Sequence, residues 1–205
     1  MFHTGPSRFP QPPAASRGMT IGLLGGSFNP AHEGHLHISL EAIKRLELDR
    51  VWWLVTPGNP LKPKGGLKPL AQRLEAAQKL ARHPRIEATG FEEHLPDAYT
   101  VHTLEFLVSR YPGVRFIWLM GADNMVQLHR WKDWRTIMSN VAVAVLDRPG
   151  YRLQAAASPA ALTFARDRVD ESDASGLWRM HPPAWTILTI PLTRASSTAL
   201  RRKAA

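Results

Sequence analysis

The segment GGSFNPAHEGH at positions 25–35 combines residue types that suit the binding of an anion. Gly25 and Gly26 allow a bulky group to approach the backbone, and the proline that follows restricts the turn. His32 and His35 stand three residues apart where a helix can begin, and the free amides and dipole of a helix start favour negative charge. Imidazole N–H groups there could bind phosphate oxygens and stabilise charge on a leaving pyrophosphate. A metal-binding pair or two surface histidines are the alternatives; we favour phosphate because the chain has no cysteine and no carboxylate-rich partner motif.

A second candidate phosphate site is the segment SSTALR at positions 196–201. Ser196, Ser197 and Thr198 can cap a final helix and offer hydroxyl groups. Arg201 falls one turn later, on the same side as Ser197. Hydroxyls, backbone amides and a guanidinium together predict a clamp for a triphosphate. The same residues would also suit an ordinary capped helix that ends in a solvated basic tail.

Short apolar runs alternate with helical patterns along the chain. One helix is predicted to bury a face made of Leu36, Leu40, Ile43 and Leu46. The order predicts an α/β protein, a doubly wound parallel sheet with helices on both faces and a Rossmann-like architecture. Ligands of such sheets bind at the carboxyl ends of the strands, where the segment 25–35 is expected. The predicted strands are residues 21–25, 51–57, 85–91, 115–121, 141–146 and 185–190.

The composition predicts one domain over residues 20–205, and we expect the protein in the cytoplasm. The chain has 205 residues, 44% of them hydrophobic, and no apolar stretch long enough for a membrane span. Residues 1–19 are rich in proline without a periodic pattern, so we expect a disordered extension, and a chain starting at Met19 would still contain the first strand. The formal charge of +9 favours anionic partners. A basic nucleic-acid-binding protein is an alternative, although the basic residues are scattered.

The motif at 25–35 resembles the G-G-[ST]-F-[DN]-P-x-H-x-G-H signature of the nucleotidyltransferase superfamily, and SSTALR resembles its S-[ST]-T-x-[IL]-R phosphate motif. Four segments between them are similar to elements of bacterial nicotinate mononucleotide adenylyltransferases: DAYTVHTLEFL at 97–107, IWLMGADNM at 117–125, LHRWKDWRTI at 128–137 and VLDRPGY at 145–151. Residues 97 and 98 depart from the family, which often has Arg or Ser there. The resemblance spans residues 20–203 and implies the same fold.

The resemblance also implies the residues that bind ATP. Asp123 is expected to accept from ribose hydroxyls, although it would also suit a helix N-cap. Arg148 is expected against the adenine, and its alternative role is to stabilise a turn. The predicted catalytic residues are His32, His35 and Arg201. The predicted ATP contacts are Gly25, Gly26, Ser27, Phe28, His32, His35, Gly121, Asp123, Arg148, Ser196, Ser197, Thr198 and Arg201.

For the second substrate, the resemblance implies five contact residues. Trp131 is expected to stack on the pyridine ring, although it could belong to a core stripe. Thr100 and the backbone around Tyr99 are expected to donate hydrogen bonds to the nicotinate carboxylate; Thr100 would also suit a helix N-cap. Asn59 and Lys62 are expected near the phosphate of the mononucleotide, and Lys62 could equally be an ordinary exposed lysine.

The implied reaction joins nicotinate mononucleotide to the AMP part of ATP and releases pyrophosphate, a step of NAD biosynthesis. The 5′-phosphate attacks the α-phosphorus in line, so the protein positions two anions and supplies no nucleophile. Mg²⁺ is expected on the ATP phosphates, and no metal ligands are predicted in the protein. Nicotinamide mononucleotide and phosphopantetheine are the alternative substrates within this fold. No nucleic-acid or membrane partner is expected, and a homo-oligomer is compatible with the sequence.

Overall fold

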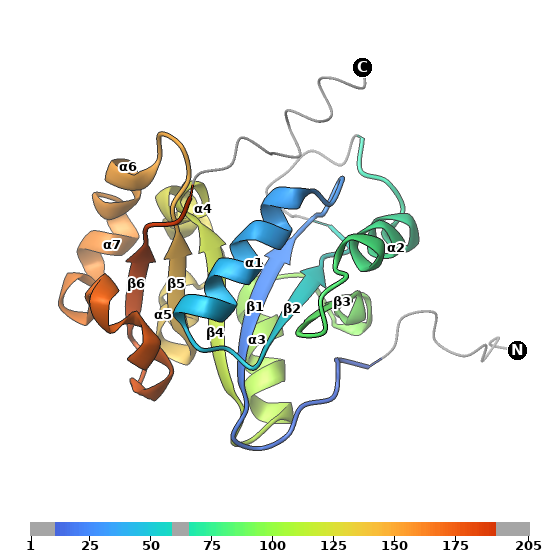
Figure 1. Cartoon of the computed structure of the whole chain (residues 1–205), viewed down its shortest axis with the longest axis horizontal. Helices are drawn as coiled ribbons and strands as arrows, with labels where there is room; N and C mark the ends of the chain where they lie inside the picture. The colour runs from blue at the N-terminus through green and yellow to red at the C-terminus, as the bar shows by residue number, and fades with distance from the viewer. Residues whose placement is uncertain (1–10, 59–65, 192–205) are drawn as a thin grey trace, which may run out of the picture.

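The computed structural model describes residues 11–58 and 66–191, which contain a six-stranded parallel sheet (Figure 1). The strand order is β3-β2-β1-β4-β5-β6, and every neighbouring pair is parallel. The chain therefore winds in both directions from β1, as the doubly wound fold class predicts. The fold class and all six predicted strands are confirmed. The strands are β1 (Thr20–Gly26), β2 (Arg50–Val55), β3 (Ile86–Thr89), β4 (Arg115–Gly121), β5 (Ala142–Leu146) and β6 (Trp185–Leu188).

Helices cover both faces of the sheet. In Figure 1, α1 and α2 lie in front of the sheet and α3 lies behind it. The front face carries α1 (Glu33–Arg45), α2 (Leu70–Leu80) and the 3₁₀ helix η4 (Glu171–Arg179). The other face carries α3 (Thr100–Arg110), α4 (Ala122–Gln127), α5 (Trp134–Asn140), α6 (Arg152–Ala156) and α7 (Pro159–Thr163). The shorter 3₁₀ helices are η1 (Phe91–His94), η2 (Leu128–Arg130) and η3 (Ala165–Asp167). Among these described helices, none has the length and apolarity needed to span a membrane.

The core is divided by the sheet into two apolar layers. The two neighbouring tryptophans of β2 show the division, because Trp52 packs in one layer and Trp53 in the other, and both are fully buried. Successive side chains of a strand point to opposite faces, so a strand covered on both faces needs a continuous apolar run. This requirement explains the run VWWLV that predicted the strand.

Helix α1 packs with a slightly different face than its sequence predicts. Leu40 is 38% exposed, so its assignment to the buried face is wrong. Ser39 is fully buried beside it: its hydroxyl accepts a hydrogen bond from Trp53 Nε1 at 2.7 Å and donates one to the backbone oxygen of His35 at 2.8 Å. A buried hydroxyl with both bonds made replaces an apolar contact, which apolar periodicity alone does not reveal.

The prediction of a disordered extension is wrong for residues 11–19, and residues 1–10 lie outside the described part. Pro12 and Pro13 are buried, and the Tyr111 hydroxyl at the end of α3 lies 3.3 and 3.1 Å from their backbone oxygens. The Gly18 amide donates to the Gly113 oxygen at 2.8 Å. A proline-rich segment has little chain entropy to lose, so it can pack without regular secondary structure.

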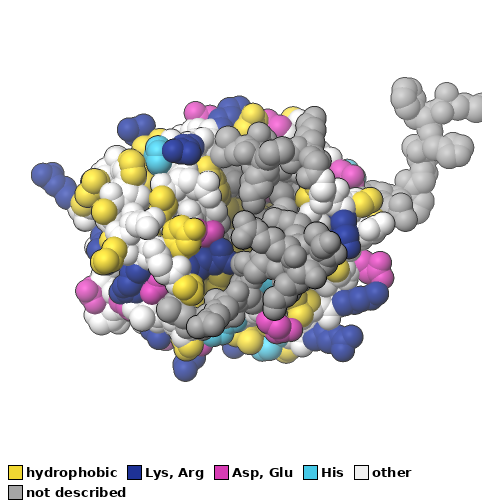
Figure 2. Space-filling view, turned by 90° about the horizontal axis from the view of Figure 1, so that it is seen from above, with side chains coloured by type: hydrophobic (Ala, Val, Ile, Leu, Met, Phe, Trp, Pro, Cys, Tyr) yellow, Lys and Arg dark blue, Asp and Glu magenta, His cyan; other side chains and the backbone are white. Residues whose placement is uncertain are grey.

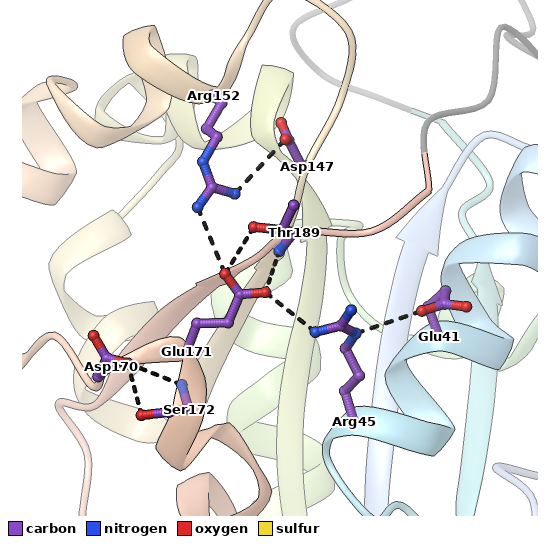
Figure 3. Close-up of polar contacts among 8 residues, drawn as sticks. All are labelled: Glu41, Arg45, Asp147, Arg152, Asp170, Glu171, Ser172 and Thr189. Atoms are coloured by element: carbon purple, nitrogen blue, oxygen red, sulfur yellow. Dashed lines mark hydrogen bonds and ion pairs between the residues drawn. The ribbon is translucent and has the colours of Figure 1, made fainter.

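An ion-pair network connects the carboxyl end of α1 to the β6 edge of the sheet (Figure 3). The Glu171 carboxylate in η4 accepts hydrogen bonds from the Thr189 amide at 2.6 Å and hydroxyl at 2.7 Å. It also pairs with Arg45 of α1 at 3.2 Å and with Arg152 of α6 at 3.6 Å. One carboxylate thus joins α1, α6 and the residue that follows β6, which helps to fix the helix that begins at His32.

Candidate active site

The candidate site is a cavity of about 150 Å³ at the carboxyl ends of the strands. Figure 2 views the molecule from this side and shows Lys, Arg and His side chains among hydrophobic ones. The cavity lies beside the end of β1, where the doubly wound fold predicts a ligand. It is lined by Gly25, Gly26, Ser27, Thr56, Gly58, Glu92, Ala98, Tyr99, Thr100, Trp118, Asn124, Trp131 and Lys132.

The two predicted catalytic histidines lie together at the amino end of α1. His32 is the N-cap, and its Nδ1 accepts a hydrogen bond from the Gly34 amide at 3.1 Å. The His32 amide in turn donates to Nδ1 of His35 at 3.2 Å, and the ring centroids are 3.9 Å apart. His35 Nδ1 also lies 3.3 Å from the His32 oxygen, but an Nδ1 that accepts from the His32 amide carries no proton to donate to that oxygen. Both Nδ1 atoms therefore act as acceptors, and Nε2 carries the proton of each neutral ring.

Both imidazoles are neutral near pH 7. Burial, with a smaller contribution from the nearby Arg148 charge, lowers the pKa of His32 to about 4. Burial and the neighbouring His32 lower the pKa of His35 to about 3, and Arg148 adds to the effect. A neutral imidazole with its Nδ1 occupied offers one N–H donor at Nε2. The pair therefore presents two oriented donors beside the fixed positive charge of Arg148.

Phe28 packs against His35 on the side of the core. The residue is 1% exposed, and its ring centroid lies 4.5 Å from that of His35 and 5.2 Å from that of Trp53. Because the ring is enclosed in the core, a contact of Phe28 with ATP would be made by its backbone, and this contact remains a prediction. Its backbone has a φ of 45°, a left-handed conformation that is unfavourable for a bulky residue and helps to shape the loop before α1.

Gly25 and Gly121, two of the predicted glycines, stand where neighbouring side chains occupy the place that a Cβ atom would take. A Cβ atom at Gly25 would overlap the Trp118 ring that lines the cavity. A Cβ atom at Gly121 would lie 2.5 Å from Asp123 Oδ1, so a side chain there would displace this carboxylate. Arg148 Nη1 donates to Asp123 Oδ2 at 2.8 Å, while Oδ1 is buried without a partner among the described residues. The pair lies at the carboxyl ends of β4 and β5, and its contacts with ATP remain predictions.

The predicted pyridine-binding residues line the cavity together: Tyr99, Thr100 and Trp131. The N-cap of α3 is Tyr99 and that of α4 is Gly121, so the alternative N-cap roles of Thr100 and Asp123 are wrong. The Tyr99 amide donates to Asp97 Oδ1 at 3.1 Å, and the contact of the backbone around Tyr99 with the nicotinate carboxylate remains a prediction. The amides of the first helical residues lack partners within a helix, which leaves Thr100 and its successor as donors.

Sequence reasoning missed three charged residues at this site. Lys132 lines the cavity, with its ammonium 4.6 Å from the centre of the Tyr99 ring. Glu92 lines it from η1. Arg73 of α2 is 2% exposed and donates to the backbone oxygens of four loop residues, Ser27 at 2.7 Å, Thr56 at 2.7 Å, Pro57 at 3.3 Å and Lys68 at 2.8 Å. In the sequence, the position of Lys132 next to Trp131 is a signal for Lys132. Glu92 and Arg73 have no comparable signal.

Six predicted contact residues lie outside the described residues: Asn59, Lys62, Ser196, Ser197, Thr198 and Arg201. Their roles remain predictions. Within residues 11–58 and 66–191, no group of three or more His, Asp or Glu side chains could hold a metal ion. The donors that the described residues do supply are amides, imidazoles and cations, which suit phosphates.

Comparison with known proteins agrees with this geometry. A family model described as cytidylyltransferase-like matches residues 23–203. Curated relatives are named probable nicotinate-nucleotide adenylyltransferase: one from Cereibacter sphaeroides is 54% identical over 89% of this chain and 96% of its own length. One from Methylorubrum extorquens is 54% identical over 90% of this chain and 100% of its own length.

The fold is also found among solved structures. Plasmodium falciparum nicotinic acid mononucleotide adenylyltransferase complexed with NaAD superimposes with a TM-score of 0.67. The match covers 90% of this chain and 83% of that one at 16% sequence identity, so it supports the fold alone. The family model and the identity to the curated relatives decide the classification. The chain belongs to the cytidylyltransferase-like family and, within it, to the nicotinate-nucleotide adenylyltransferases.

Proposed function

We propose that this protein transfers the adenylyl group of ATP to nicotinate mononucleotide, forming nicotinate adenine dinucleotide and pyrophosphate. The observation that carries the proposal is the position of one cavity, walled by Tyr99, Trp118 and Trp131, at the sheet edge where α1 presents its neutral histidine pair. The aromatic side chains suit a pyridine ring. The amino end of α1 suits phosphates.

The chemistry needs no nucleophile from the protein. The 5′-phosphate of the mononucleotide attacks the α-phosphorus of ATP, the new P–O bond forms, and the bond to pyrophosphate breaks with the electron pair on the leaving oxygen. His32 and His35 would donate through Nε2 to phosphate oxygens whose charge increases, while Arg148 supplies permanent positive charge. We propose that Mg²⁺ arrives bound to the ATP phosphates.

The acid form of the mononucleotide is the better match to the cavity. The first amides of α3 are hydrogen-bond donors, and the start of a helix favours an anion. The Lys132 ammonium adds positive charge at the same wall. A nicotinamide group would turn its NH₂ toward donors and leave polar groups unpaired. These features support nicotinate over nicotinamide mononucleotide.

The test is pyrophosphate release with ATP and each mononucleotide in competition. We expect kcat/KM for the acid to exceed that for the amide by roughly 100-fold, the effect of two mispaired contacts. Lys132→Met should reduce this ratio, whereas Lys79→Met, which changes an exposed lysine of α2 in a surface ion pair, should leave it unchanged. Trp131→Ala should weaken both substrates alike. Equal use of the two, or preference for the amide, would refute the nicotinate assignment.

A further inference from the structure

Glu92 is a buried carboxyl group that the proposed reaction does not yet use. It belongs to η1, directly after β3, and is 6% exposed. Its Oε1 accepts a hydrogen bond from the Thr103 hydroxyl at 2.7 Å, while the neighbouring Thr56 hydroxyl donates to the Gly58 oxygen at 2.8 Å. Its Oε2 is buried and has no partner among the described residues. Burial raises the pKa of Glu92 to about 7.

The Oε2 atom of Glu92 has no protein partner among the described residues, so a ligand is a candidate partner. A buried polar atom without a hydrogen bond is costly, and native proteins rarely keep one that has no use. Glu92 lines the same cavity as Trp131 and Thr100. A ligand in that cavity can therefore supply the missing partner.

We propose that Glu92 binds the mononucleotide by taking a hydrogen bond from one of its two ribose hydroxyls. This role rests on the proposed function, since the ligand is the nucleotide that the cavity would hold. Glu92 is then a substrate-binding residue at the ribose, distinct from the residues at the pyridine ring and at the phosphates.

The donors and acceptors of the mononucleotide indicate that Glu92 contacts a ribose hydroxyl. Nicotinate mononucleotide carries a carboxylate and a phosphate, which are acceptors, and its ribose hydroxyls are its hydrogen-bond donors. A charged Glu92 facing either anion would be repelled. A hydroxyl both donates and accepts, so it pairs with the carboxyl group whether or not that group is protonated. The ribose is thus the part of the ligand that complements this side chain in either state.

The test compares nicotinate mononucleotide with its 2′-deoxy and 3′-deoxy analogues on the same enzyme preparation. The ratio of two kcat/KM values does not depend on the fraction of folded enzyme, so a destabilised variant still gives an answer. We expect the wild-type chain to discriminate by about 10-fold to 100-fold against one analogue. Glu92→Ala should lose nearly all of that discrimination, and Glu92→Gln should keep part because its amide oxygen still accepts. Glu93→Gln, a change at the exposed neighbour in η1, should behave as the wild type.

Three results would count against the proposal. Wild-type turnover without discrimination against either analogue, or discrimination that Glu92→Ala retains, would overturn the ribose contact and leave the proposed function standing. No pyrophosphate release from the wild-type chain with nicotinate mononucleotide would overturn the proposed function and the contact together.

Discussion

His32 has two roles in the structure that substitutions can separate. Its Nδ1 caps α1 by accepting from the Gly34 amide, and its Nε2 is left as a donor for a phosphate oxygen. His32→Ala removes both roles. His32→Asn keeps an acceptor near the position of Nδ1, because asparagine is among the best N-cap residues, but it lacks a donor at the position of Nε2.

The two roles predict different magnitudes. Loss of one donor to a developing charge costs about 10²-fold to 10³-fold in kcat, so both variants should lose at least 10²-fold. Loss of an N-cap costs about 0.5–2 kcal/mol, which lowers the melting temperature of a chain this long by roughly 1–8 °C. His32→Ala should show this shift, while His32→Asn should melt close to the wild type.

The assays are pyrophosphate release under saturating substrates and thermal denaturation of each variant. Wild-type kcat in His32→Asn would refute the donor role of the imidazole. A melting temperature of His32→Asn as low as that of His32→Ala would refute the separation of the cap from the donor. Mononucleotide binding, measured by calorimetry, should be nearly unchanged in both variants because the lost donor acts mainly in the transition state.

Three further changes test the supports of the site. Arg73→Met leaves four loop carbonyls without their cationic donor, so the melting temperature should fall by roughly 6 °C or more and kcat should fall with it; an unchanged kcat would show that the loops hold without Arg73. Deleting residues 1–18 removes the segment on Tyr111 and should lower the melting temperature with kcat kept, and unaltered melting would contradict this packing. Histidine pKa values of about 4 and 3 predict that His32 and His35 show no NMR titration above pH 5. Their contribution to stability should fall as pH drops from about 6.5 toward 4, because the unfolded chain then binds more protons, and titration near pH 6.5 would refute the burial effect.

The sequence predicts well those features that depend on neighbouring residues. Each strand is a short apolar run, and the start of α1 at His32 and Glu33 follows from a local turn motif. The candidate residues before α1 and around Tyr99 lie in such segments, and the fold brings them to one edge of the sheet.

Features that depend on distant contacts could not be predicted in this way. Arg73 stands in the helical pattern AQRLEAAQ, where an arginine is ordinarily exposed, and its side chain is buried against carbonyls of two separate loops, the one after β1 and the one after β2. Glu92 stands in FEEH beside a second glutamate, and no local signal says which of the two is buried. The packed segment before β1 was missed for the same reason, since its partner Tyr111 lies about a hundred residues away in sequence.

At the phosphate end of the site, the neutral histidines and the cation Arg148 have different electrostatic roles. A protonated imidazole would bind the anionic substrates strongly before reaction, and such uniform binding does not raise kcat. Burial and the charge of Arg148 keep His32 and His35 neutral, so their donors are already oriented and need no proton from solvent. Arg148 is itself held by Asp123, whose Oδ2 lies 2.8 Å from its Nη1. The attraction for the anionic substrates therefore does not depend on protonation of the histidines, while the stabilisation of the transition state comes from short, directed hydrogen bonds.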